Sequence, residues 1–201
     1  MRILVAGGVL LISAYSLGYR TTWTHSLPFG LYRLVEVSPG AVQLGDLVLL
    51  CLPAEIGRWA RGRGYLSKGS CPGRVEPVGK LIAAVSGDRI IVRRDGIFVR
   101  HRLPHSRPLS LDSRHRPLPH PSFGVYELSD GELWLHAPHP RSFDSRVYGS
   151  VSRESVRAGL AAVLVPGYPV ARDDLLLFVL TVAGSALLPI LSIRLECRDV
   201  R

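Results

Sequence analysis

Residues 77–88 read PVGKLIAAVSGD, and Lys80 stands in them between Val78 and the apolar run 81–85. The only other lysine, Lys68, lies in the polar, glycine-rich stretch YLSKGSCPG. A buried lysine can lose its proton because burial lowers its pKa far below about 10.4, which arginine cannot do. Lys80 is therefore a candidate general base. The alternative is a lysine whose apolar stem packs while its ammonium reaches water, and composition alone favours this alternative.

A candidate nucleophile, Ser26, precedes this run in THSLPFGLYR, residues 24–33. A serine becomes a strong nucleophile when a neighbouring base accepts its proton, and lysine can be that base. Ser, Pro and Gly are also common turn residues at the start of a folded domain. The local sequence therefore leaves both interpretations open.

An apolar segment stands at each end of the chain. Residues 3–19 are 17 consecutive residues without a charge, preceded by Arg2. Their length is at the short end for a membrane-spanning helix and also fits the core of a signal peptide, with cleavage possible near residues 14–16. We expect a retained anchor, because the candidate nucleophile follows so closely. The body of the protein should then lie across the membrane.

The C-terminal segment, residues 175–193, is 19 residues long and is interrupted only by Pro189. The arginine-rich tail that follows it would prefer the cytoplasmic side. We therefore predict two spans, with residues 20–172 outside, although 175–193 could instead be a buried core helix. The predicted organisation is an anchor or signal segment at 1–19, a β-rich domain at 20–172 and an apolar helix with a basic tail at 173–201.

All of the net charge of +9 lies in the middle of the chain, since residues 51–120 hold 14 Lys and Arg against 5 Asp and Glu. These arginines are scattered through turn-rich sequence, with no basic helix and no zinc-finger spacing. We expect a solvated basic face near lipid headgroups and no nucleic-acid partner.

The three cysteines are Cys51, Cys71 and Cys197. Outside the cytoplasm, Cys51 and Cys71 could close a loop of about 20 residues, or both could be free thiols. Cys197 would stay reduced on the inner side. The cysteine spacing matches no zinc site.

The body of the chain has the pattern of β-strands. Residues 31–37 and 46–52 are β-rich and flank a Ser-Pro-Gly turn. Residues 89–100 and 125–137 each predict a hairpin, with Asp95-Gly96 and Asp130-Gly131 at the turns. The fold class is therefore mostly β, in a single domain.

The Pro- and His-rich stretch 101–121 predicts a surface loop. Its histidines lack regular spacing, so we expect no metal site there. His136 and His139, which flank Pro138, are assigned to surface loop on the same grounds.

Three stretches, in this order, resemble the signal-peptidase superfamily of Ser/Lys membrane proteases. SLPFG at 26–30 is similar to the nucleophile box, GDLVLL at 45–50 with GKLIAAVSGD at 79–88 to the strand and lysine box, and SFDSRVYG at 142–149 to the closing box. Together they span residues 24–149. The resemblance implies a signal-peptidase-like catalytic β domain with a membrane anchor and no metal or cofactor.

The resemblance also supports catalytic roles for Ser26 as nucleophile and Lys80 as base. The tetrahedral intermediate needs hydrogen-bond donors for its oxyanion. The Ser26 backbone N–H is one candidate. The Thr24 hydroxyl, two residues earlier and on the same side of an extended chain, is a second.

In the closing box, the resemblance implies that Ser142 orients the Lys80 amine. It further implies that Asp144 and Arg146 form an ion pair that braces the site, with Asp144 as a third, acidic catalytic residue. Taken without the other boxes, residues 144–146 would be a solvated turn with a weak surface ion pair.

The form Ser-Leu-Pro-x-Gly-Leu-Tyr-Arg and the insert at 51–73 resemble the TraF-type peptidases of conjugative transfer systems. This branch implies maturation of a membrane-anchored pilin precursor, which in some members extends to joining its ends into a ring. The implied location is the bacterial inner membrane, with the catalytic domain on the periplasmic side and other transfer-apparatus components as further partners. The C-terminal apolar run is a departure from this branch. Two alternatives are a general type I signal peptidase and a non-catalytic assembly subunit of the transfer apparatus.

Overall fold

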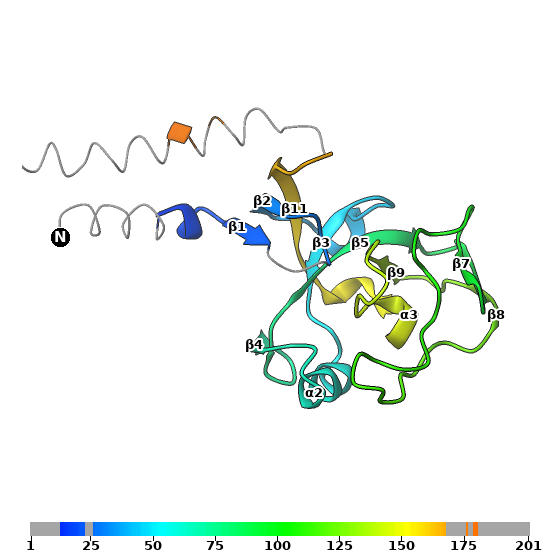
Figure 1. Ribbon diagram of the computed structural model, residues 1–201. Helices are drawn as coiled ribbons and strands as arrows, with labels where there is room; N and C mark the ends of the chain where they lie inside the picture. The colour runs from blue at the N-terminus through cyan, green and yellow to red at the C-terminus, as the bar shows by residue number, and fades with distance from the viewer. Residues whose placement is uncertain (1–12, 23–25, 168–175, 177–178, 181–201) are drawn as a thin grey trace, which may run out of the picture. The chain divides into compact units, whose positions relative to one another are not determined.

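The computed structural model describes residues 13–22, 26–167, 176 and 179–180 (Figure 1). These residues divide into two compact units. Of the described residues, the larger unit comprises 26–28 and 36–160, and the smaller one contains 13–22, 29–35, 161–167, 176 and 179–180. Most of the regular structure is β, as the sequence predicted.

The main sheet of the larger unit is antiparallel, with the strand order β11-β3-β5-β9-β10. The bounds are β3 Leu47–Leu50, β5 Val78–Val85, β9 Glu132–His136, β10 Val151–Ser152 and β11 Val156–Leu164. Lys80 lies in the middle of this sheet, because β5 pairs with β3 on one side and with β9 on the other.

Two apolar cores lie against β5 and β9. One contains Ile82 with Leu135, and the other contains Ala84 with Trp134. The pairing of β5 with β9 shifts its register between Ile82 and Ala84. A strand that is buried on both faces has a nearly continuous apolar sequence, which explains the run LIAAV after Lys80.

A smaller sheet packs around the second core. Its order is β7-β6-β8, with β6 Arg89–Arg93, β7 Gly96–Phe98 and β8 Gly124–Glu127. The hairpin predicted at 89–100 is confirmed, although Arg93 pairs directly with Gly96, so that Gly96 is already part of β7.

The hairpin predicted at 125–137 is wrong. The two strands flank Asp130-Gly131, but β8 pairs with β6 and β9 pairs with β5 and β10. All four residues of β8 are exposed and β9 is almost entirely buried, and the two strands belong to different sheets.

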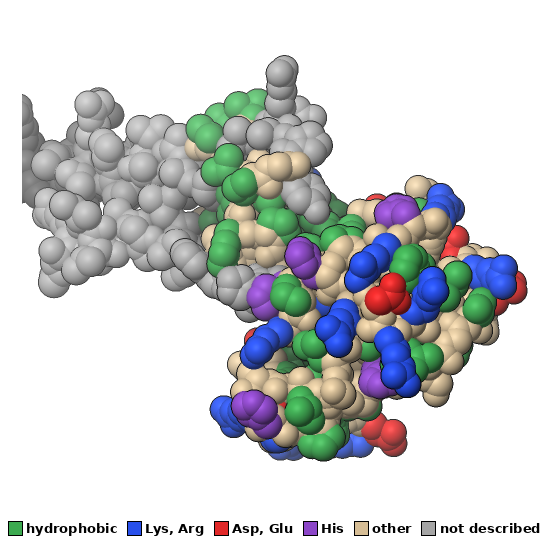
Figure 2. Space-filling model, turned by 45° about the vertical axis from the view of Figure 1, so that its right-hand side comes forward, with side chains coloured by type: hydrophobic (Ala, Val, Ile, Leu, Met, Phe, Trp, Pro, Cys, Tyr) green, Lys and Arg blue, Asp and Glu red, His purple; other side chains and the backbone are tan. Residues whose placement is uncertain are grey.

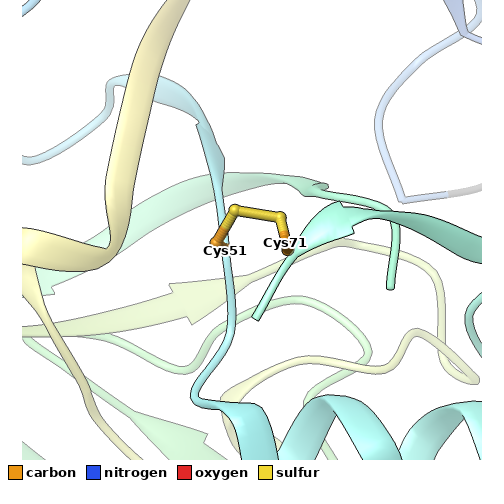
Figure 3. The surroundings of a disulfide bond; sticks show 2 residues. All are labelled: Cys51 and Cys71. Atoms are coloured by element: carbon orange, nitrogen blue, oxygen red, sulfur yellow. A yellow bond between two sulfur atoms is a disulfide. The ribbon is translucent and has the colours of Figure 1, made fainter. Parts of the chain in front are cut away.

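The insert between β3 and β5 forms helix α2 Ala54–Gly62 and strand β4 Lys68–Cys71. The sequence interpretation contained no helix here. α2 buries Gly57 and Ala60, and a side chain at Gly57 would lie 2.9 Å from Cγ2 of Val75. A disulfide joins Cys51, just after β3, to Cys71 at the end of β4, with α2 close by (Figure 3).

In the smaller unit, β1 Tyr19–Thr22 pairs antiparallel with β2 Gly30–Val35, and β2 is followed in the sheet order by β11. Within the described residues, no helix has the length and apolar character needed to cross a membrane. Most of both predicted apolar segments, 3–19 and 175–193, lies outside the described residues, as does Cys197.

The disulfide gives the first prediction. Replacing both Cys51 and Cys71 by Ala should lower the free energy of unfolding by about 2–4 kcal/mol, because the unfolded chain then regains the entropy of a loop closed at a sequence separation of 20. Thermal and denaturant unfolding of the full chain, with and without reductant, measure this difference. Reductant should destabilise the parent protein and leave the double variant unchanged; equal stability of the two oxidised proteins would contradict the prediction.

Candidate active site

The Lys80 amine lies between two serine hydroxyls. Its Nζ donates hydrogen bonds to Oγ of Ser26 at 2.7 Å and to Oγ of Ser142 at 3.0 Å. The side chain is 1% exposed, so the amine does not reach bulk water. This geometry excludes the packed-stem alternative for Lys80. The three residues come from the segment before β2, from β5 and from the segment after β9, and only the fold brings them together.

Leu27 and Gly79 bring the side chains of Ser26 and Lys80 close together. Leu27 is buried, and a side chain at Gly79 would lie 2.8 Å from Cδ1 of Leu27. Glycine therefore leaves the space that Leu27 occupies. Because Leu27 follows Ser26 and Gly79 precedes Lys80, this contact holds Ser26 against Lys80.

The surroundings of Lys80 give it a larger neutral fraction than a lysine has in water. Burial lowers the pKa of Lys80 to about 8, and this effect exceeds the opposing influence of the negative charge on Asp144. The positive charge of Arg146 lowers the pKa further. One unit below its pKa, roughly one tenth of such an amine is neutral, so a neutral fraction of Lys80 exists near neutral pH.

Asp144 and Arg146 form a buried ion pair rather than the solvated turn considered above. Nε of Arg146 lies 2.8 Å from Oδ1 of Asp144 and Nη2 lies 2.7 Å from Oδ2, a two-point contact. Both side chains are buried. Such a pair is costly to disrupt, because removing either partner leaves an uncompensated charge away from water.

The closing box also completes the hydrogen bonding of β9. β10 pairs only with Glu132 and Leu133. Farther along the chain, side-chain oxygens accept instead of a neighbouring strand: the Leu135 N–H of β9 donates to Oγ of Ser145 at 2.8 Å, and the N–H of Ala137, just after β9, donates to Oδ2 of Asp144 at 3.1 Å. The segment that carries Ser142 is thereby attached directly to the main sheet.

Arg146 fixes the turn between β9 and α3 Ser145–Tyr148. Its guanidinium donates to the carbonyl oxygens of His139 at 2.8 Å and Pro140 at 3.2 Å, and also to that of His105 in the loop 101–121. Five N–H donors in one plane make arginine suited to this bridging role, which lysine cannot replace.

The surface-loop assignment of His136 is wrong. His136 ends β9 and is 1% exposed, with Nε2 2.9 Å from the carbonyl oxygen of Pro104 and Nδ1 3.9 Å from Oδ2 of Asp144. Burial lowers the pKa of His136, which favours the neutral ring. Pro138 suggested a loop, but the buried strand extends to the residue two positions before it.

A cleft of about 370 Å³ opens beside the Lys80 amine. Its lining includes Ser26, Lys80 and Ser142 together with Tyr65, Leu66 and Phe143. The sequence interpretation did not identify Tyr65, Leu66 or Phe143. Only their positions could have identified them as cleft residues: Tyr65 and Leu66 follow α2 within the insert, and Phe143 follows Ser142 in the closing box. Thr24, the expected oxyanion donor, lies outside the described residues.

Basic side chains are spread over the face of the molecule seen in Figure 2, with fewer acidic side chains among them. Among the described residues, no group of three or more His, Cys, Asp or Glu side chains has the arrangement needed to hold a metal ion.

The buried ion pair gives the second prediction. Arg146→Ala should lower the free energy of unfolding by about 3–5 kcal/mol, because it leaves Asp144 charged and unpaired in the interior. The matched control is Arg100→Ala: Arg100 is 70% exposed and pairs with Asp88 at 3.6 Å, so its loss should cost less than about 1 kcal/mol. Denaturant unfolding of both variants measures the difference, and similar losses would contradict the prediction.

Comparison with known proteins assigns the chain to a family. Residues 3–165 match the family described as signal peptidase, peptidase S26. The chain is 39% identical over 149 residues to a probable conjugal transfer protein TraF of Sinorhizobium fredii, covering 72% of this chain and 75% of that protein. It is 32% identical over 169 residues to the plasmid transfer protein TraF of Escherichia coli, covering 81% and 93%.

The chain is also 35% identical over 156 residues to the conjugal transfer protein TraF of Agrobacterium tumefaciens, covering 74% of this chain and 86% of that protein. Among solved structures, a signal peptidase I from Enterococcus faecalis aligns with 63% of this chain and 99% of its own, at 16% identity and a TM-score of 0.34. The protein therefore belongs to the signal peptidase family, peptidase S26, and has TraF conjugal transfer proteins as relatives.

Proposed function

We propose that this protein is a membrane-associated serine endopeptidase in which Ser26 is the nucleophile and Lys80 is the general base. The observation that carries the proposal is the buried Lys80 amine, with a pKa lowered to about 8, at 2.7 Å from the Ser26 hydroxyl. A nucleophile and a base within hydrogen-bond distance, with the base oriented by a third group, is the arrangement that covalent catalysis requires.

In the first step, neutral Lys80 accepts the Ser26 proton as Oγ attacks the scissile carbonyl. The resulting ammonium then donates a proton to the leaving amine, and the acyl-enzyme remains. Water resolves it to a linear product, or the amino end of the substrate resolves it to a ring. Exclusion of water from the cleft favours the second route.

The residues around the amine have separate roles in this mechanism. Ser142 fixes the position of Nζ through its 3.0 Å hydrogen bond. Arg146 partly offsets the charge of Asp144 and so limits how far the carboxylate raises the pKa of Lys80. Asp144 therefore acts through its neighbours as a positioning residue. The Ser26 N–H and the Thr24 hydroxyl remain the proposed oxyanion donors, each worth about a hundredfold to a thousandfold in rate.

The proposed substrate is a membrane-anchored precursor, a conjugative pilin, because the relatives at 32–39% identity are named as conjugal or plasmid transfer proteins. The proposed location is the inner membrane, with the catalytic domain on the periplasmic side. The disulfide supports this location, since disulfides persist in oxidising compartments. The uncharged segment 3–19 supports it as an anchor, and an anchor next to Ser26 suits a substrate cleaved close to the bilayer.

The third prediction tests the dyad. Ser26→Ala should abolish processing of the pilin precursor, and Lys80→Ala should lower kcat by about 10²–10⁴-fold, because each removes one partner of the proton transfer. Lys80→Arg should fail as well, since arginine keeps its proton. Mass spectrometry of the precursor in donor cells measures processing, and a product one water lighter than the linear chain identifies ring closure.

Strand β4 offers matched controls, because Lys68 and Ser70 are exposed. Lys68→Ala and Ser70→Ala should process the precursor normally. Full processing by Ser26→Ala would contradict the proposal and support a scaffold role. Accumulation of many unprocessed exported proteins, rather than one, would instead identify a general signal peptidase.

The fourth prediction concerns pH. Since only neutral Lys80 can act as base, kcat/KM should rise with pH through about 8. Asp144→Asn should move this rise to lower pH, because the charge that raises the pKa of Lys80 is lost while the charge of Arg146 remains. The control Asp95→Asn changes a carboxylate that is 61% exposed and should leave the profile unchanged. A rise in the same place for both variants would contradict this account.

A further inference from the structure

A second hollow lies directly beside the cleft, in the larger unit. It is bounded by the loop 107–118, by the segment 140–147 and by Tyr65. Its volume is about 130 Å³. Apolar protein cavities of about 150 Å³ accept a molecule as large as benzene, so this space matches one aliphatic or aromatic side chain.

The walls of this hollow are largely apolar. They include Leu109, Leu111, Leu118, Phe143 and Val147. Leu111 is 46% exposed and lines this hollow. Apolar side chains that surround an open hollow gain free energy when an apolar group enters and displaces water.

Hydrogen bonds hold the loop in place and keep the hollow open. The Asp112 carboxylate accepts from the Tyr65 hydroxyl at 2.5 Å, from Nε of Arg116 at 2.7 Å and from two backbone N–H groups of the same loop. Arg63, just after α2, donates to the carbonyl oxygen of Pro117 at 2.6 Å. The loop is therefore tied to the insert and does not depend on an occupant for its shape.

The hollow and the cleft share Tyr65, Arg141, Ser142 and Phe143. Ser142 is separated from Ser26 by only two hydrogen bonds, through Nζ of Lys80. An extended peptide advances about 3.3 Å per residue, so a side chain in the hollow belongs to a residue within about three positions of the scissile bond.

We propose that this hollow, the Leu111 pocket, binds one large aliphatic or aromatic side chain of the substrate and so contributes to the choice of cleavage site. The inference rests on the proposed function, because it assumes that peptide cleavage occurs at Ser26. It assigns specificity to the loop 107–118, which lies far in sequence from the nucleophile and the base.

The test uses the full-length protein in detergent and a randomised decapeptide library, with products identified by mass spectrometry. The parent protein should prefer Leu, Ile, Met or Phe at one position within three residues of the cut. Leu111→Trp should fill the pocket and lower kcat/KM for those peptides about 10–200-fold, while peptides with Gly or Ala at that position change less than about twofold. Leu111→Ala should shift the preference toward Phe and Trp.

Val125→Trp is the matched control, because Val125 is also about half exposed but lies on β8, outside both hollows. An unchanged preference in both Leu111 variants, or an equal loss for all peptides, would overturn the pocket assignment. Ser26→Ala separates the two proposals. If the pocket assignment fails but Ser26→Ala abolishes cleavage, the proposed peptidase function still holds. If Ser26→Ala still cleaves, the proposed function is wrong.

Discussion

Lys80 is buried in the larger unit, and its amine donates hydrogen bonds to the partly buried hydroxyls of Ser26 and Ser142 beside the cleft. Burying an amine without a directly bound carboxylate is costly, and the cost falls on the protonated form. The same cost lowers the pKa of the amine and so raises its neutral fraction. Lys80 is buried because β5 is a central strand of the sheet and contributes side chains to both apolar cores.

The Asp144–Arg146 pair limits the effect of a buried carboxylate on Lys80. The Asp144 carboxylate favours the ammonium form of Lys80, yet it also supplies the acceptor for the backbone N–H of Ala137, just after β9. Arg146 compensates the charge of Asp144 while leaving its oxygens in place as acceptors. Its remaining donors bind carbonyl groups of the turn that presents Ser142 and of the loop 101–121. Arg146 thus both neutralises the charge of Asp144 and holds the turn that carries Ser142.

The two predicted hairpins show that a local turn signal does not by itself determine which strands pair. Asp95-Gly96 and Asp130-Gly131 are similar turn signals, and the strands around the first do pair with each other. The strands around the second do not, because burial separates them: β9 has a nearly fully buried sequence and joins the main sheet, while exposed β8 joins β6. α2 was missed because its insert is short and rich in Gly and Arg, and its packing on Val75 depends on Gly57.

The sequence by itself determined the family, the mostly β class and the candidates Ser26, Lys80, Ser142, Asp144 and Arg146, because a lone lysine in an apolar run and three ordered boxes are local features. Only the tertiary structure decided the rest. The contact of Leu27 with Gly79 sets the distance between serine and lysine, and the burial of His136 and the closeness of the Leu111 pocket to the cleft arise from segments remote in the chain. Such contacts leave no periodic trace in the sequence, since each depends on how the strands are ordered in the sheet.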